Sequence, residues 1–242
     1  MDTVSIILPT YNERDTIEPL ITRLFNALPD AEVIVVDDDS PDGTWHIAQA
    51  LQPKHPRLKV HRRLNERGLT TAIQAGIDLS TGDLVGWLDC DLSMPPAVFT
   101  RMIPHFETAD FVLGSRYVSG GKDDRPFLRR LSSLIICTTG RIFLGTATKD
   151  LTSGFILCRR TIVDAFPLKG YYGEYCIELI FRAERHNFTV KEIPYHFTDR
   201  AIGESKTFPS MRGFLRLGMR YLTVIARLSF ERISSSFLSI TC

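Results

Sequence analysis

The chain has 242 residues, of which 44% are hydrophobic and 24% charged, and its formal net charge is +1. These values exclude a disordered or fibrous chain, and the length suffices for one large domain with or without an appendage. The five cysteines are scattered without metal-binding spacing, which indicates reduced thiols, and the N-terminus lacks the basic segment of a signal peptide. We therefore expect a cytoplasmic protein.

Charge is distributed unevenly along the chain. Residues 1–116 contain 10 Lys and Arg against 17 Asp and Glu, whereas residues 117–242 contain 19 against 11. An acidic half suits divalent metals and hydroxyl groups, and a basic half suits anions. The asymmetry favours phosphorylated substrates, an anionic membrane or nucleic acid as partners.

Short apolar runs alternate with helical patterns in the N-terminal part of the chain. The predicted strands are Val4 to Leu8, Glu32 to Val36, Leu58 to His61 and Leu84 to Leu88. Helical spacing of apolar residues begins at Ile17, Thr44 and Gly68. Because strands that alternate with helices of this length form right-handed βαβ units, we predict an α/β fold with a mostly parallel central sheet and helices on both faces.

Acidic residues follow three of these strands. Glu13 follows the first strand, Asp37 to Asp39 follow the second, and Asp89 and Asp91 follow the last. Open α/β sheets bind ligands outside the carboxyl ends of their strands, where carboxylates suit a divalent cation or sugar hydroxyls. We therefore expect a binding site at this edge of the sheet.

Two further observations limit that interpretation. Asp39 and Asp42 are explained equally well as turn-forming or helix-capping residues. No Gly-x-Gly-x-x-Gly follows the first strand, and Gly-Lys-Ser/Thr does not occur, so the phosphate cradles of dinucleotide cofactors and of P-loops are missing. A nucleotide bound here would have its phosphates held by metal and arginine.

The second half of the chain is basic. A strand is predicted at Phe111 to Gly114, with Arg116 just beyond it, and the glycine-rich stretch from Ser119 to Arg125 has the composition of a mobile loop. Basic and hydroxyl side chains then occur beside an apolar helix and in a later loop: Arg129, Ser133, Arg200 and Lys206. Such side chains beside an apolar helix suit phosphate attached to a hydrophobic group.

Residues 211–228 are apolar enough to raise the question of a membrane span. Four arginines interrupt them, at positions 212, 216, 220 and 227. Each arginine near a bilayer centre costs about 2.5 to 3.5 kcal/mol, whereas each Leu, Ile, Phe or Val returns about 0.3 to 0.6 kcal/mol. We therefore predict a catalytic domain at residues 1–208 and a C-terminal amphipathic helix and tail at 209–242, either at a membrane interface or packed on the domain.

Several separated segments resemble one known family in the same order. They are VSIILPTYNE at 4–13, VVDDDSPDGT at 35–44, Asn65 to Gly68, Asp89-Cys90-Asp91, GSRY at 114–117, TSGF at 152–155 and DRAIGESK at 199–206. From about residue 4 to 208 the chain resembles the family 2 glycosyltransferases of the polyprenol-phosphate (dolichol-phosphate) mannosyltransferase type. The resemblance implies a GT-A fold and metal-dependent, inverting transfer of mannose from GDP-mannose to a polyprenyl phosphate, with Mg²⁺ or Mn²⁺.

The resemblance also implies roles for individual residues. The nucleoside pocket would be lined by Pro9, Tyr11, Glu13, Val36, Asp37 and Asp38. The metal and the diphosphate would meet Asp89, the backbone of Cys90, and Asp91, with both carboxylates as metal ligands. Donor phosphates would be held by Arg116, Arg200 and Lys206, and the acceptor phosphate would face Arg129 and Ser133.

Three other positions have open roles. Ser93 stands where some relatives place a metal-ligating Gln, and serine is a shorter and weaker ligand. Asp150 and Glu178 match recurrent acids of the family, but capping or pairing with arginine explains them at least as well. A phosphate acceptor is already ionised at neutral pH, so we expect Arg129, and not a carboxylate base, to orient the nucleophile.

Rival functions keep the same fold. One is transfer of glucose or an aminosugar from a UDP-sugar to undecaprenyl phosphate, although such relatives usually carry two transmembrane helices after the catalytic domain. Another is a non-catalytic, membrane-associated subunit that binds a nucleotide sugar without turnover. Nucleic acid is disfavoured because the basic residues lack interleaved aromatic side chains. We expect a peripheral protein on the cytoplasmic face of a membrane, with a membrane-anchored protein as a further partner.

Overall fold

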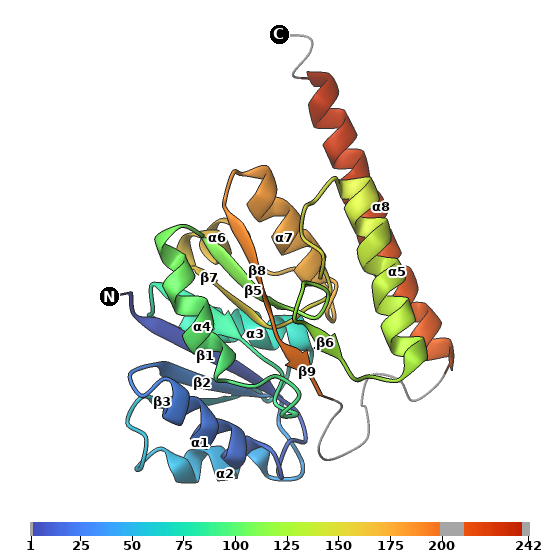
Figure 1. Cartoon of the computed structure of the whole chain (residues 1–242). Helices are drawn as coiled ribbons and strands as arrows, with labels where there is room; N and C mark the ends of the chain where they lie inside the picture. Colours follow the sequence, from blue (N-terminus) through green and yellow to red (C-terminus); the bar gives the residue numbers. More distant parts are fainter. Residues whose placement is uncertain (1, 199–210, 239–242) are drawn as a thin grey trace.

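The computed structural model describes residues 2–198 and 211–238. Within them, seven strands form one sheet in the order β3-β2-β1-β4-β7-β5-β8 (Figure 1). The strands are β1 Val4–Thr10, β2 Glu32–Asp37, β3 Leu58–Arg62, β4 Leu84–Trp87, β5 Phe111–Ser115, β7 Ile156–Arg159 and β8 Val190–Pro194. A separate ribbon pairs β6 Lys122–Asp123 with β9 His196–Phe197.

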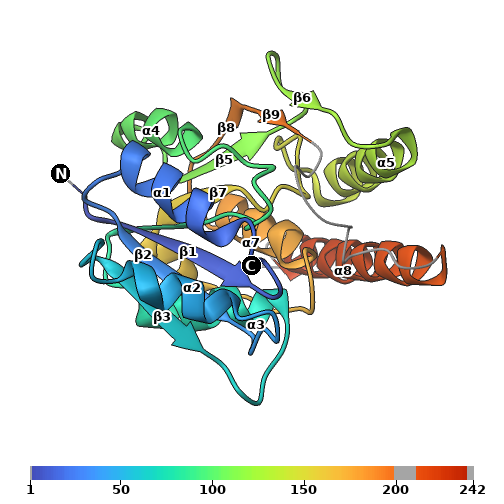
Figure 2. The ribbon, with the colours of Figure 1, turned by 90° about the horizontal axis from the view of Figure 1, so that it is seen from below.

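Helices cover both faces of this sheet (Figures 1 and 2). One buried core lies between the sheet and α1 Ile17–Ala27, α2 Thr44–Leu51 and α4 Val98–Met102, which runs into the 3-10 helix η1 Ile103–Glu107. The other core is formed with α3 Leu69–Leu79, α5 Phe127–Leu144, α6 Arg160–Ala165, α7 Tyr175–Arg185 and α8 Met211–Leu238. The prediction of an α/β fold with a mostly parallel sheet is confirmed.

The parallel strands of the N-terminal half align their carboxyl ends. In the register of β1 with β2, Thr10 is opposite Asp37, and in that of β1 with β4, Ile7 is opposite Trp87. All side chains of β4 are buried, as the uninterrupted apolar run predicts for a strand covered on both faces. The loops that follow β1, β2 and β4 therefore meet at one edge of the sheet.

Strand β7 breaks the parallel pattern. It runs antiparallel to both β4 and β5 and lies between them, which the sequence analysis did not predict. Gly86 allows the close approach of β4 and β7, since a Cβ atom there would lie 2.7 Å from the carbonyl oxygen of Ile156. As a consequence, the segment that precedes β7, residues 152–155, is brought to the end of β4.

The glycine-rich segment 119–125, whose composition is that of a mobile loop, contains a turn and a short strand. The segment turns at Gly120, whose φ of +86° favours glycine, and then continues into β6, which pairs with β9. The guanidinium of Arg125 donates to both carboxylate oxygens of Asp123, at 2.9 and 2.6 Å. These bonds fix the approach to α5.

Helix α8 packs lengthwise beside α5, away from the sheet (Figure 1). Its buried apolar residues are Tyr221, Ile225 and Leu228. Four charged side chains also join α8 to α7: Arg182 and Arg227 each pair with both Glu178 and Glu231. No helix in the two described ranges is long and apolar enough to cross a membrane.

The four cysteines that lie in the described ranges, at positions 90, 137, 158 and 176, are free and buried. Burial raises the pKa of the Cys137 thiol to about 11, so this thiol is protonated at neutral pH.

Candidate active site

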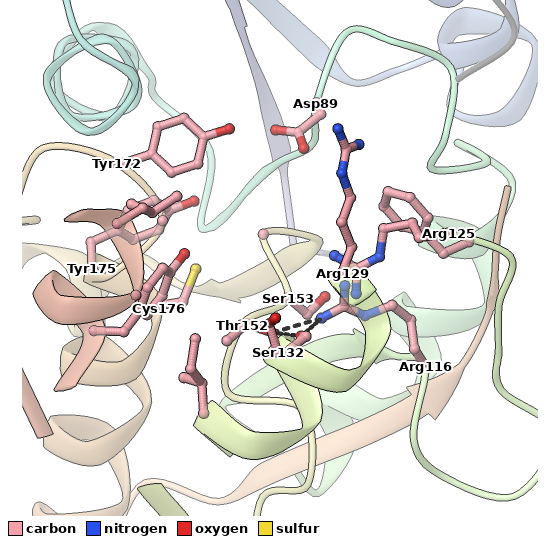
Figure 3. A pocket seen from close by; sticks show the side chains of 18 of the residues that line it. Asp89, Arg116, Arg125, Arg129, Ser132, Thr152, Ser153, Tyr172, Tyr175 and Cys176 are labelled. Atoms are coloured by element: carbon pink, nitrogen blue, oxygen red, sulfur yellow. Dashed lines mark hydrogen bonds between the residues drawn. The ribbon is translucent and has the colours of Figure 1, made fainter. Parts of the chain in front are cut away.

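A pocket of about 400 Å³ lies beyond the carboxyl end of β4 (Figure 3). Helix α5, helix α8 and the segment that precedes α7 all contribute to its walls. Asp89 and Asp91 form its acidic part. Its basic and hydroxyl lining consists of Arg116, Arg125, Arg129, Ser132, Ser133, Thr152 and Ser153. Its apolar lining includes Ile135, Ile136, Leu217, Met219 and Leu222. The pocket thus joins acidic, basic and apolar surfaces from distant parts of the chain.

The acidic loop turns sharply after β4. Leu92 has a φ of +64°, which places its backbone in the left-handed region. Ser93 donates to Oδ1 of Asp91 through both its hydroxyl, at 2.5 Å, and its backbone N–H, at 3.1 Å. Ser93 therefore orients the Asp91 carboxylate, which is only 4% exposed and still lines the pocket.

The chemistry of Asp89 and Asp91 fits a divalent metal. Two carboxylates supply the hard oxygen ligands that Mg²⁺ and Mn²⁺ prefer. Among the residues that the structure describes, no three His, Cys, Asp or Glu side chains are arranged to hold a metal by themselves. Such a pair suits a metal that completes its coordination with water and substrate phosphate, as Mg²⁺ commonly does.

Of the three arginines that line the pocket, Arg116 is the buried one. Its Nε and Nη2 donate to the two carboxylate oxygens of Asp150, at 2.8 and 2.6 Å, and Nη2 also donates to Thr152. Burial opposes the charge on Arg116, but the Asp150 carboxylate more than offsets this, so the pKa of Arg116 lies well above its usual value. Asp150 is thus an arginine partner, one of the two explanations its sequence position allowed.

The hydroxyl of Ser133 belongs to the same network. Its Oγ lies 2.7 Å from Oγ1 of Thr152 and 3.5 Å from Nη2 of Arg116. The sequence analysis named Ser133 and Arg116 but assigned no role to Thr152, which links them. The TSGF segment was the available signal, because Thr152 is its first residue.

Two more arginines flank this network. Arg129 lies in the first turn of α5, and in Figure 3 its side chain extends from the helix toward Asp89. Arg125, held by Asp123, lies 5.2 Å from the centroid of the Phe197 ring. The sequence analysis named Arg125 only as the end of the glycine-rich stretch and assigned it no role.

The acids after β2 have many partners inside the protein. Asp37 is fully buried and accepts hydrogen bonds from the hydroxyls of Thr10 and Ser40. Asp38 accepts two hydrogen bonds from the guanidinium of Arg63 through Oδ1 and one from the backbone N–H of Gly68 through Oδ2. Asp37 and Asp38 therefore fix the loops beyond β1 and β3.

The remaining residues predicted for the nucleoside pocket surround these acids. Pro9 and Val36 are opposite each other in the register of β1 and β2, and the Glu13 N–H donates to the hydroxyl of Thr44. The guanidinium carbon of Arg67 lies 4.8 Å from the centroid of the Tyr11 ring. These residues form a group at the edge of the sheet next to the pocket but are not part of its lining.

Other predicted residues have simple outcomes. Asp42 accepts from the N–H and the hydroxyl of Thr44, which is its alternative role as a turn and capping residue. Asp39 pairs with Arg62 at 2.5 Å, and Glu178 pairs with arginines as its alternative predicted. Arg200 and Lys206 lie outside the described residues. Cys90 is buried between the two acids.

Aromatic side chains form the wall opposite the arginines. The Tyr175 hydroxyl accepts a hydrogen bond from Nε1 of Trp87 at 2.8 Å, and burial raises the pKa of Tyr175 well above its usual value. Tyr172 lies closer to the acids, and in Figure 3 its hydroxyl points toward the space beside Asp89. The sequence analysis missed this wall.

Comparison with known proteins identifies relatives by sequence. Residues 5–166 match the family described as Glycosyl transferase family 2. The chain is 41% identical over 209 residues to a dolichol-phosphate mannosyltransferase of Pyrococcus furiosus. The aligned region covers 84% of this chain and 58% of that protein. The chain is also 36% identical over 210 residues to a polyprenol monophosphomannose synthase of Mycolicibacterium smegmatis. That alignment covers 83% of this chain and 79% of the other protein.

Comparison of structures identifies the fold. A crystal structure of glucosyl-3-phosphoglycerate synthase from Mycobacterium tuberculosis, in complex with Mn²⁺, UDP and phosphoglyceric acid, superposes with a TM-score of 0.72 at 18% identity. The match covers 94% of this chain and 78% of that one. A second structure of that enzyme, with Mg²⁺ and UDP, gives the same TM-score. The expected GT-A fold is therefore confirmed.

Proposed function

We propose that this chain, which belongs to glycosyl transferase family 2, transfers mannose from GDP-mannose to a polyprenyl phosphate with inversion at the anomeric carbon. The names of relatives at 36% and 41% identity support this choice of sugar and acceptor. The single observation that carries the proposal is the composition of the pocket. Carboxylates for a metal-bound diphosphate, arginine and serine for a second phosphate, and apolar side chains for a lipid line the same space.

The donor would be held at the acidic end. Asp89 and Asp91 would bind Mg²⁺ or Mn²⁺, which would neutralise the negative charge that develops on the departing diphosphate. Tyr11, Asp38 and their neighbours beyond β1 and β2 would hold the nucleoside. Because Arg116 forms a buried ion pair with Asp150 and also contacts Ser133, we propose that it positions Ser133, in addition to its expected role toward the donor.

The acceptor phosphate would be oriented by Arg129 and Ser133. A phosphate oxygen attacks the anomeric carbon, and the bond from that carbon to the donor diphosphate breaks, so that the nucleoside diphosphate leaves with the bonding electrons. The phosphate monoester is ionised at neutral pH, so no base has to remove a proton from it. Orientation of the two substrates by fixed cations then supplies most of the catalysis.

The isoprenoid part of the acceptor would leave the pocket between α5 and α8. Pocket residues from these helices are mostly apolar, and both helices also expose large hydrophobic side chains to solvent: Phe127, Ile142 and Phe143 on α5, and Phe230 and Ile233 on α8. So many exposed apolar side chains are unusual on a surface that contacts only water. We propose that this surface rests on a membrane that contains the acceptor lipid.

One assay tests this function directly. The protein is incubated with GDP-mannose, Mg²⁺ or Mn²⁺ and a short polyprenyl phosphate, and the lipid fraction is analysed for phosphate-linked mannose. We expect product formation that is lost when the metal is chelated. Transfer from UDP-glucose but not from GDP-mannose would contradict the proposed donor. Donor binding without transfer to any acceptor would support a non-catalytic binding subunit instead.

A further inference from the structure

The segment before α7 places an aromatic residue at the point where both substrates would meet. Residues 168–174, LKGYYGE, connect the region of α6 to α7 and contribute Tyr172 and Gly173 to the pocket lining. Tyr172 is half-buried, whereas its neighbour Tyr171 is 68% exposed. The two tyrosines thus differ in their surroundings although they are adjacent in sequence.

This segment is held firmly by its own bonds. The buried carboxylate of Glu174 accepts the backbone N–H of Tyr171 at 2.8 Å and that of Tyr172 at 3.0 Å. Gly170, with a φ of +125°, permits the turn that brings these N–H groups to Glu174. The Tyr172 carbonyl also accepts a hydrogen bond from the Thr70 hydroxyl at 2.8 Å.

Contacts with α8 complete the support. Gly173 fits against Tyr221, because a Cβ atom at Gly173 would lie 2.4 Å from the Tyr221 hydroxyl. The Arg220 guanidinium lies 4.7 Å from the centroid of the Tyr171 ring. The backbone around Tyr172 is therefore fixed between α3 and α8.

The phenol of Tyr172 faces the reaction space. In Figure 3 the hydroxyl of Tyr172, the carboxylate of Asp89 and the guanidinium of Arg129 point toward one region of the pocket from three different segments. If Asp89 lies at the donor diphosphate and Arg129 at the acceptor phosphate, the sugar lies between them. A sugar presents hydroxyl groups and apolar C–H faces, and a tyrosine offers both a hydrogen-bonding group and an apolar ring.

We infer that Tyr172 contacts the transferred sugar of the donor and contributes to its recognition. This inference rests on the proposed function, because it places the sugar between the two phosphate sites. It assigns to the aromatic wall a role that neither metal binding nor phosphate binding requires. It also predicts that Tyr172 distinguishes a nucleotide sugar from the nucleotide alone.

Binding measurements on matched variants test this inference. Tyr172→Ala, Tyr172→Phe and the control Tyr171→Ala are compared with the wild type by calorimetry, using GDP-mannose and GDP as ligands in the presence of Mg²⁺. Tyr172→Ala should weaken GDP-mannose binding about tenfold and leave GDP binding unchanged, and Tyr172→Phe should cause a loss of about two- to fivefold if the hydroxyl donates or accepts one hydrogen bond. Tyr171→Ala should alter neither affinity.

Two results would overturn the inference. An equal loss of GDP and GDP-mannose binding, accompanied by a lower melting temperature, would mean that Tyr172 only supports the fold. Unchanged binding of both ligands in Tyr172→Ala would mean that the sugar lies elsewhere. If the wild type binds UDP-glucose instead, the proposed donor is wrong, and the same comparison with UDP-glucose and UDP decides the role of Tyr172.

Discussion

Two groups of acidic residues lie at the same edge of the sheet and differ in their surroundings. Asp37, the last residue of β2, and Asp38, the residue after it, accept hydrogen bonds from hydroxyls, a buried arginine and a backbone N–H of neighbouring segments. The loop after β4 contains Asp89 and Asp91, which line the pocket. The comparison teaches that carboxylates at a strand end can fix neighbouring segments, as Asp38 does, and can also line a pocket, as Asp91 does while it keeps its hydrogen bonds from Ser93.

The largest expected effect is at the pocket-lining loop. Asp91→Asn keeps an oxygen that can accept from Ser93 but removes the charge that a metal needs, so turnover should fall by at least about 10³-fold while the melting temperature stays nearly constant. Initial rates of mannosyl transfer and thermal unfolding are measured on the same preparation. A large loss of stability with a small loss of rate would place Asp91 with the loop-fixing acids.

A loss of stability is expected when Asp38 is replaced. Asp38→Ala leaves the buried guanidinium of Arg63 without its carboxylate, which should lower the free energy of unfolding by about 3 kcal/mol. Urea denaturation measures this change. Asp39→Ala is the matched control, because the Asp39 pair with Arg62 is partly exposed and should contribute at most about 1 kcal/mol. Equal effects of the two substitutions would contradict the structural role of Asp38.

A further prediction concerns Arg129, one of the arginines that line the pocket. Arg129→Ala should raise the KM for polyprenyl phosphate about tenfold or more, since one charged hydrogen-bonding partner of the acceptor is lost, and should leave GDP-mannose binding almost unchanged. Steady-state kinetics with each substrate varied in turn measure this. Arg130→Ala is the control, because Arg130 is exposed and does not line the pocket. Equal losses toward donor and acceptor would show that Arg129 serves both.

The smallest effect concerns the charges that join α7 to α8. Burial alone would raise the pKa of Glu178, but Arg227 and Arg182 lower it below the ordinary value of 4.5. A group with a lowered folded-state pKa stabilises the protein above its unfolded pKa, and this stabilisation is lost as the pH falls through the folded value.

Glu178→Gln should therefore lower the free energy of unfolding by about 1 kcal/mol at pH 7. The difference from the wild type should shrink as the pH falls below about 4.5, where the wild-type carboxylate becomes protonated. Chemical denaturation at several pH values measures both. A difference that stays constant down to acid pH would show that the ion pairs do not stabilise the packing of α8.

Much of the fold was predictable because its signals are local. The apolar residues of α1 recur at helical spacing, and all five of its buried residues, from Ile17 to Phe25, follow this pattern. Antiparallel β7 was not predictable in this way, because its apolar residues do not indicate which strand they pair with or in which direction. The ribbon of β6 and β9 was missed for a similar reason, since each strand has only two residues.

The candidate site was also predictable only in part. The sequence by itself determined the strand-end acids, the basic second half and the family resemblance, because residue type and spacing along the chain are enough to recognise them. Only the tertiary structure decided that Asp38 holds Arg63, that Arg116 holds Asp150, and that Tyr172 faces Asp89. These outcomes depend on contacts between residues far apart in the chain, and such contacts form only when the sheet order brings the segments together.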